Sequence, residues 1–146
     1  MFSQKSKPKH LSHPLVMAFW TFDLFHAWHE YYLMKASQYG KSLIVVIARD
    51  RRVERIKWNT PIHTESARQN TVAQHFPHAS VVLGDEYDIF APIDRFSPDI
   101  LALWYDQNAP LSELSVRYPT LEIVRIDGYD TEIWKSSKIR SRYEDS

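Results

Sequence analysis

The sequence predicts a single α/β domain built on an open parallel sheet, and two observations carry this prediction. Five short apolar runs recur along the chain, and they are nearly continuous and rich in β-branched residues, as is typical of strands covered on both faces. Segments with helical spacing separate the runs, and strict alternation of strand and helix favours right-handed crossovers between parallel strands. The expected strands are 15–19, 43–48, 80–83, 100–103 and 121–126.

Each expected helix carries a start or stop signal. Gly40 ends the first, Ser97-Pro98 closes the third, and Pro110 lies in the first turn of the fourth. The second begins near Thr64 and runs through Phe76. The other expected helices are 29–39, 87–96, 108–118 and 136–143.

Length and composition limit the classes of function. The 146 residues suit one domain, expected at 14–146 behind a flexible N-terminal tail at 1–13. Lys plus Arg and Asp plus Glu number 18 each, so no bulk charge attracts nucleic acid or membrane. The absence of cysteine excludes disulfides and thiolate catalysis and fits a cytoplasmic protein. The longest apolar runs fall short of the ~20 residues of a membrane helix. Any affinity for anions must therefore be local.

The stretch 20–29, Trp-Thr-Phe-Asp-Leu-Phe-His-Ala-Trp-His, places His26 and His29 where the first strand turns into a helix. A helix start presents unpaired N–H groups and the positive end of the dipole, which together form an anion site. Two imidazoles added there suit phosphate chemistry. Taken alone, this spacing also suits a zinc pair, or a helix cap beside a surface histidine.

Three further segments are candidates for ligand binding. Lys135-Ser136-Ser137-Lys138-Ile139-Arg140 opens the last expected helix with hydroxyls and cations suited to phosphates. Trp104-Tyr105-Asp106-Gln107 follows the fourth strand, and Arg49–Lys57 is basic. The alternatives are ordinary caps for the first two segments and a solvated basic face for the third.

These motifs resemble the cytidylyltransferase-like nucleotidyltransferases, the HxGH superfamily, over about residues 15–142. The stretch 20–29 is similar to their G-T-F-D-x-x-H-x-G-H signature, and 135–139 and 104–107 are similar to the K-S/T-S-K-I and G-Y-D-Q motifs of archaeal-type FAD synthases. Further segments similar to that branch are 45–50, 83–85 and 97–100.

The resemblance implies a Rossmann-like fold with strand order 3-2-1-4-5 and helices on both faces, with ligands at the switch between strands one and four. It implies transfer of AMP or CMP from ATP or CTP to a phosphorylated acceptor, with release of pyrophosphate and with Mg²⁺ or another divalent ion on the triphosphate. FMN adenylylation is the expected reaction, glycerol-3-phosphate cytidylylation is the alternative, and a homodimer is common in the family.

The resemblance also assigns roles to residues, with no protein ligand to a metal among them. The residues matched to catalytic positions are His26, His29 and Lys57. Those matched to nucleotide-binding positions are Thr21, Phe22, Asp106, Gln107, Lys135, Ser136, Ser137 and Arg140. Arg68 matches an arginine that fixes the loop around Pro61.

Tryptophan replaces the family's glycine at positions 20, 28 and 104, and less surely at 58. The chain has 3 glycines, where average usage near 7% predicts about 10, and 5 tryptophans. One explanation is an inactive nucleotide-binding domain whose pocket is filled with aromatic side chains. The other is a gene in which UGA codons meant as glycine were translated as tryptophan. Nucleic-acid binding through the basic ends is a third, weaker hypothesis for function.

Overall fold

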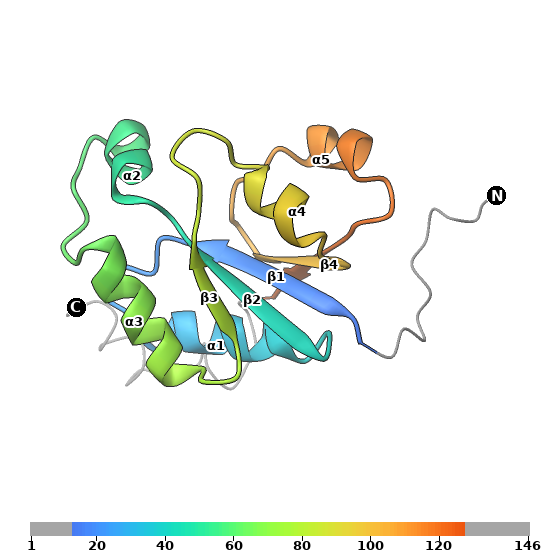
Figure 1. Ribbon diagram of the computed structural model, residues 1–146, viewed down its shortest axis with the longest axis horizontal. Coiled ribbons are helices and arrows are strands. Elements are labelled where there is room, and N and C mark those ends of the chain that lie inside the picture. Colours follow the sequence, from blue (N-terminus) through green and yellow to red (C-terminus); the bar gives the residue numbers. More distant parts are fainter. Residues whose placement is uncertain (1–12, 128–146) are drawn as a thin grey trace.

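The computed structural model describes residues 13–127, which form a five-stranded parallel sheet with helices on both faces (Figure 1). The sheet order is β3-β2-β1-β4-β5, and every neighbouring pair is parallel. This confirms the predicted fold class and strand order. The strands are β1 (Leu15–Trp20), β2 (Ser42–Ile47), β3 (Ser80–Leu83), β4 (Ile100–Trp104) and β5 (Glu122–Ile126).

Helices cover the two faces of the sheet in pairs. The helices are α1 (Ala27–Ser37), α2 (Asp50–Lys57), α3 (Glu65–His75), α4 (Ala91–Phe96) and α5 (Leu111–Arg117). Figure 1 shows α1 and α3 on one face and α4 and α5 on the other. The core is accordingly split, with Tyr32 and Val72 in one apolar cluster and Ile93 and Leu114 in the other. Burial of these two apolar layers against the strands stabilises the sheet from both sides.

The helix expected from Thr64 is confirmed, with the Thr64 hydroxyl accepting the backbone N–H of Ala67 at 3.1 Å. Two other helices, α4 and α5, start later than expected. The Asp85 carboxylate accepts the N–H groups of Tyr87 and Asp88, and Asp88 accepts that of Phe90. These side chains hold a turn where a helix was expected, so α4 begins only at Ala91.

Helices α5 and α2 also differ from the sequence prediction. Pro110 is the N-cap residue of α5 and its backbone is not helical, so this helix begins at Leu111. Residues 50–57, which the sequence identified only as basic, form the additional helix α2. The helix expected at 136–143 and most of the expected N-terminal tail lie outside the described residues.

Candidate active site

The two histidines of the opening motif lie at the start of α1. His26 is the N-cap, and its Nδ1 accepts the backbone N–H of Trp28 at 3.3 Å. The Nδ1 of His29 accepts the backbone N–H of His26 at 3.3 Å, which completes a capping box made of imidazoles. The rings are stacked with centroids 4.2 Å apart. The capping considered as an alternative is thus real, and it orients both rings together.

Both imidazoles are electrically neutral near neutral pH. Burial lowers the pKa of His26 below its ordinary value. Burial, followed by repulsion from His26, lowers the pKa of His29 to about 3, and the Asp23 charge opposes this only in part. Because each Nδ1 accepts a backbone N–H, the ring proton of each neutral imidazole resides on Nε2. Each ring therefore offers an Nε2–H donor.

A cavity of about 260 Å³, here called the histidine hollow, is lined by His26 and His29. Thr21, Phe22 and Lys57, all predicted site residues, line it as well. The structure thus brings five predicted site residues from three segments of the chain around one hollow. Lys57 is exposed at the end of α2, where its ammonium group can meet an anion that enters from solvent.

A buried arginine holds the loop that leads to the histidines. Arg68 is 1% exposed and donates to the carbonyls of Thr21 at 2.7 Å and His63 at 3.1 Å, and to Asp50 Oδ1 at 2.6 Å. Asp23 accepts the N–H groups of Ile62 and His63 at 2.8 and 3.0 Å. These bonds, here called the polar frame, tie 21–23 to 62–63. They agree with the supporting role expected of Arg68.

The polar frame also sets the charge of Asp23. Burial raises the pKa of its carboxyl group, but the N–H donors of His63 and Ile62 and the charge of Arg68 outweigh burial. The pKa of Asp23 therefore lies below its ordinary value, and the group is a carboxylate. The sequence motif contained Asp23 without indicating this purpose.

The polar frame continues into the paired starts of α2 and α3. The Asp50 N–H donates to Glu65 Oε1 at 2.7 Å, and the Glu65 N–H donates to Asp50 Oδ2 at 3.2 Å. Each carboxylate caps the other helix, and negative charge is favourable at a helix N-terminus. The two residues are 15 positions apart in the sequence, which explains why sequence reasoning missed α2 and this reciprocal capping.

Two side chains, one in the loop and one on β5, hold the loop that follows β4. Gln107 donates from Nε2 to the Phe19 carbonyl at 2.7 Å and accepts the Trp104 N–H at 3.0 Å. Arg125, which sequence reasoning did not single out, donates to the carbonyls of Trp104 and Gln107. Asp106 is exposed at the tip of this loop. The geometry thus shows a positioning role for Gln107, while nucleotide binding by Asp106 and Gln107 stays a prediction.

Three tryptophans, here called the tryptophan cluster, fill the crevice at the strand switch. Trp20 ends β1, Trp104 ends the neighbouring β4, and Trp28 lies in the first turn of α1. The Trp104 ring lies 6.2 Å from each of the other two, centroid to centroid. The Trp20 ring also lies 6.2 Å from that of His29. The indoles therefore occupy the switch between β1 and β4, where the family resemblance places the ligand.

Several sequence predictions fall where the structure gives no evidence. Lys135, Ser136, Ser137 and Arg140 lie outside the described residues, so their approach to the histidines stays a prediction. Within 13–127, no group of three or more His, Cys, Asp or Glu is placed to hold a metal ion. Among the helices described, none has the length and apolar character needed to cross a membrane.

The geometry and the comparisons together define the class of protein. The model of the cytidylyltransferase-like family matches residues 18–142. The chain therefore belongs to this family and is a nucleotidyltransferase with a Rossmann-like fold.

Curated relatives and a solved structure place the chain within the family more closely. It is 39% identical over 127 residues to the FAD synthase of Methanosphaerula palustris, covering 84% of this chain and 82% of the relative. It is 38% identical over 132 residues to the FAD synthase of Ferroglobus placidus, covering 87% and 86%. The crystal structure of the lipopolysaccharide core biosynthesis protein from Thermoplasma volcanium superposes with a TM-score of 0.74 at 34% identity, covering 81% of this chain and 99% of that one.

Proposed function

We propose that this chain transfers AMP from ATP to FMN, forming FAD and pyrophosphate. The observation that carries the proposal is the pair of stacked neutral imidazoles at a helix start, in one hollow with Lys57. The archaeal relatives named FAD synthase support the choice of reaction. Transfer of CMP from CTP to glycerol 3-phosphate is the alternative within the same class.

The histidines suit the charge that develops during transfer. An oxygen of the acceptor phosphate attacks the α-phosphorus, the bond to the β-phosphate oxygen breaks, and pyrophosphate leaves with the electron pair. The Nε2–H groups of His26 and His29 donate to phosphate oxygens as this charge builds. Because the capping box holds both rings in place before the substrate arrives, little reorganisation is needed during the reaction.

The β- and γ-phosphates are assigned to Lys57 and to the segment 135–140. By resemblance, Lys135, Ser136, Ser137 and Arg140 donate to the phosphates from the last helix start. Thr21 and Phe22 border the same hollow as the histidines. This assignment requires the imidazoles and those hydroxyls to converge on one triphosphate, and a structure with a bound ATP analogue tests it.

Mg²⁺ enters this scheme as part of the nucleotide. Mg²⁺ retains several waters and is often bound through substrate phosphates with few protein ligands. By the family resemblance, the ion is expected on the triphosphate. When bound, the ion neutralises the charge of the triphosphate.

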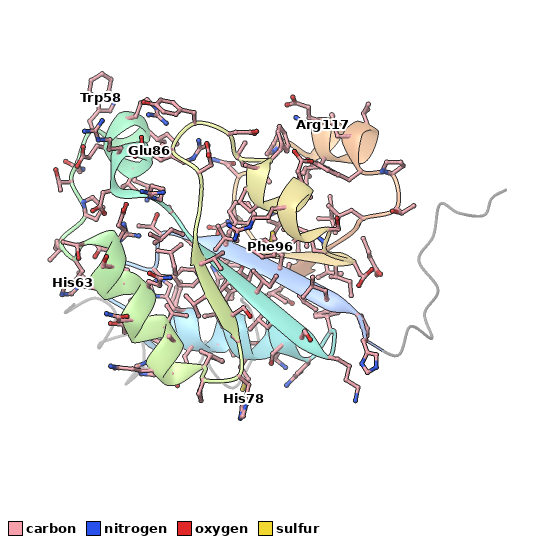
Figure 2. All side chains as sticks on the ribbon, viewed as in Figure 1. Trp58, His63, His78, Glu86, Phe96 and Arg117 are labelled. Carbon is pink, nitrogen blue, oxygen red and sulfur yellow. The ribbon has the colours of Figure 1, made fainter. Side chains whose placement is uncertain are left out.

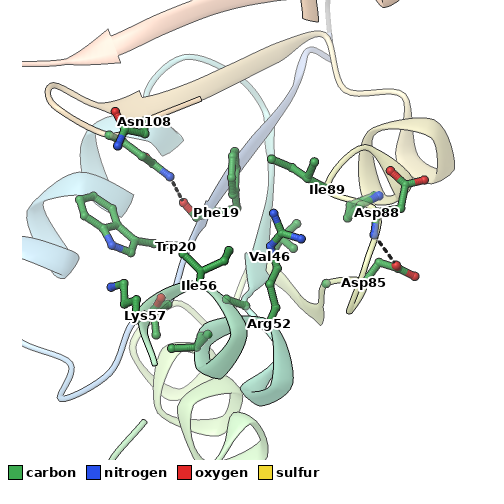
Figure 3. A pocket seen from close by; sticks show the side chains of 16 residues that line it. Phe19, Trp20, Val46, Arg52, Ile56, Lys57, Asp85, Asp88, Ile89 and Asn108 are labelled. Atoms are coloured by element: carbon green, nitrogen blue, oxygen red, sulfur yellow. Dashed lines mark hydrogen bonds between the residues drawn. The ribbon is translucent and has the colours of Figure 1, made fainter. Parts of the chain in front are cut away.

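A second cavity, here called the apolar hollow, favours FMN as the acceptor. It has a volume of about 240 Å³ and lies between α2 and the ends of β1 and β2 (Figure 3). Apolar side chains that include Phe19, Val46 and Ile89 line it, as a flat aromatic ring requires and glycerol does not. Lys57 borders both hollows, so a phosphate at their junction faces the α-phosphate and a cation.

The proposal places the enzyme in the cytoplasm, acting on small molecules and not on nucleic acid. The absence of cysteine and the balanced charge support this assignment. A homodimer is the oligomeric state that the family resemblance supports, and light scattering on the purified protein tests it.

The test is a matched pair of reactions with Mg²⁺, namely ATP with FMN and CTP with glycerol 3-phosphate. We expect FAD and pyrophosphate from the first pair. Both the chain as printed and the variant with Trp20, Trp28 and Trp104 replaced by glycine are assayed. Product from the second pair alone selects the alternative reaction, and no product from either protein overturns the proposal.

An acceptor-site variant sharpens the test. Ile56 lines the apolar hollow and is 58% exposed, so Ile56→Asp changes the wall without disturbing the core. We expect a higher KM for FMN and an unchanged KM for ATP in whichever of the two proteins is active. Ile62→Asp is the matched control, because Ile62 is 72% exposed and lines neither hollow.

A further inference from the structure

The end of α2 has a backbone conformation that suits glycine. Trp58 follows this helix with φ 61° and ψ 19°, in the left-handed region, and its N–H donates to the Glu54 carbonyl at 2.8 Å. Glycine is the usual residue at this position of a helix end because it has no Cβ to clash. The Trp58 side chain is 89% exposed and points away from the body of the protein (Figure 2). Packing therefore does little to offset the unfavourable backbone.

The two glycines among the described residues, Gly40 and Gly84, differ from Trp58 in backbone conformation. A Cβ on Gly40 would lie 2.5 Å from the Pro14 carbonyl oxygen, so close approach of the backbone requires glycine there. Yet neither described glycine has a positive φ, while four other residues do, namely Phe22, Leu24, Trp58 and Ser97. Phe22 is buried in the core, which holds it in place, whereas Trp58 has no comparable support. Neither side-chain packing nor backbone conformation therefore explains a bulky side chain at position 58.

The tryptophan cluster poses a different problem. Trp104 is 4% exposed and packs against Trp20 and Trp28 at the strand switch, where ligands bind in open α/β sheets. A pocket filled by selection would explain these three residues. It would not explain Trp58, which lines neither the histidine hollow nor the apolar hollow. A single cause must act equally on a buried crevice and on an exposed helix end.

We infer that residues 20, 28, 58 and 104 are glycine in the protein that the source organism makes, encoded by UGA codons that it decodes as glycine. Loss of three indoles opens the crevice between β1 and β4 beside His29, where the nucleotide enters. Loss of the fourth relieves the strained end of α2, next to Lys57. The second half of this inference rests on the proposed function, because it assigns the opened crevice to the nucleotide.

The codons decide the first half directly. We expect UGA at all four positions, and UGG at any of them overturns the inference. This result does not depend on folding or on activity, so it stays informative if a variant is unstable. If the codons are UGG and the chain as printed makes FAD, the inference fails while the proposed function stands.

Nucleotide binding tests the second half. Calorimetry with a non-hydrolysable ATP analogue and Mg²⁺ compares the chain as printed with the variant Trp20→Gly/Trp28→Gly/Trp104→Gly. We expect a change from no measurable binding to saturable binding. Saturable binding by the chain as printed overturns the assignment of the crevice. Binding by the variant without FAD formation from ATP and FMN overturns the proposed function and leaves this inference standing.

Trp58→Gly alone is the matched control, because position 58 lies outside the crevice. We expect it to leave nucleotide binding unchanged and to raise Tm by roughly 2–8 °C, as relief of left-handed strain predicts. A lower Tm would contradict the inference, since it would show that the protein benefits from the indole.

Discussion

The polar frame and the tryptophan cluster both adjoin His29, yet they are held together differently. In the polar frame, Arg68 and Asp23 bond mainly to backbone carbonyls and N–H groups. In the cluster, Trp20 and Trp104 pack ring against ring. Bonds to the backbone fix the path of the chain, whereas packed rings contribute buried apolar contact with little directional constraint.

This difference separates what positions the catalytic groups from what blocks access to them. The loop before α1 takes its path from the polar frame and from the imidazole capping box. We therefore expect the histidines to keep their arrangement when the cluster is removed. Substitution of glycine by tryptophan predicts this combination, in which the catalytic groups are correctly positioned but the crevice is filled.

The largest effect is expected at His26, in the variant with glycine at 20, 28 and 104. His26→Asn keeps a residue that caps helices well but removes the Nε2–H donor. We expect kcat for FAD formation to fall about 10²–10³-fold, the usual loss for one donor that stabilises the transition state. Steady-state kinetics measure this, and His78→Asn on the exposed surface is the control. An unchanged kcat would remove His26 from the mechanism.

Arg68→Met breaks the polar frame at its centre. The change removes the Arg68 donor from Asp50 Oδ1 and from two carbonyls, and we expect the free energy of unfolding to fall by about 3 kcal/mol. Urea unfolding measures this. Arg51→Met, at an exposed position of α2, should alter the free energy by no more than about 0.5 kcal/mol. Equal effects of the two variants would show that the frame does not hold the loop.

Gln107→Leu tests whether the ends of β1 and β4 are held together by the hydrogen bonds of Gln107 or by the tryptophan cluster. The variant loses the bonds to the Phe19 carbonyl and the Trp104 N–H. We expect a loss of about 1–2 kcal/mol in the free energy of unfolding, as buried backbone groups lose their partners. The neighbouring exposed Asn108→Leu serves as the control. If Gln107→Leu is neutral, the packed rings alone hold the two strands.

The remaining prediction concerns the pH dependence of stability. The pKa of His29 is about 3 in the folded chain against an ordinary value of 6.5, so between these values the unfolded chain binds a proton that the folded chain does not. The free energy of unfolding should therefore fall as pH drops from about 6.5 toward 3. The stabilisation from Asp23, whose folded pKa is below 3.8, is lost only at the acid end of this range.

Unfolding in urea at several pH values measures this slope. His29→Gln should flatten it, while His78→Gln, on the exposed surface, should leave it unchanged. An unchanged slope in His29→Gln would show that its imidazole is protonated equally in both states.

The local sequence pattern predicted the strands and the histidine motif correctly. It did not predict the helices whose bounds depend on side chains that accept backbone N–H groups in turns. The strands of this sheet are buried on both faces, so their apolar runs stand out in the sequence and their bounds were predicted to within one residue. The helix expected at 87–96 was too long, because nothing in apolar spacing reveals that Asp85 and Asp88 accept backbone N–H groups. Helix α2 was missed because only Val53 of its residues is buried and its cap comes from Glu65.

By itself, the sequence determined the order of strands and helices, the placing of His26 and His29 at a helix start, and the presence of tryptophan at four positions similar to family glycines. Each of these is a local or linear property of the chain. Only the tertiary structure decided that both imidazoles are neutral donors, that Arg68 ties together three segments, and that Trp58 has a left-handed backbone while three indoles fill the crevice. Burial, hydrogen-bond partners and backbone angles arise from contacts between residues far apart in the chain, and no local pattern specifies them.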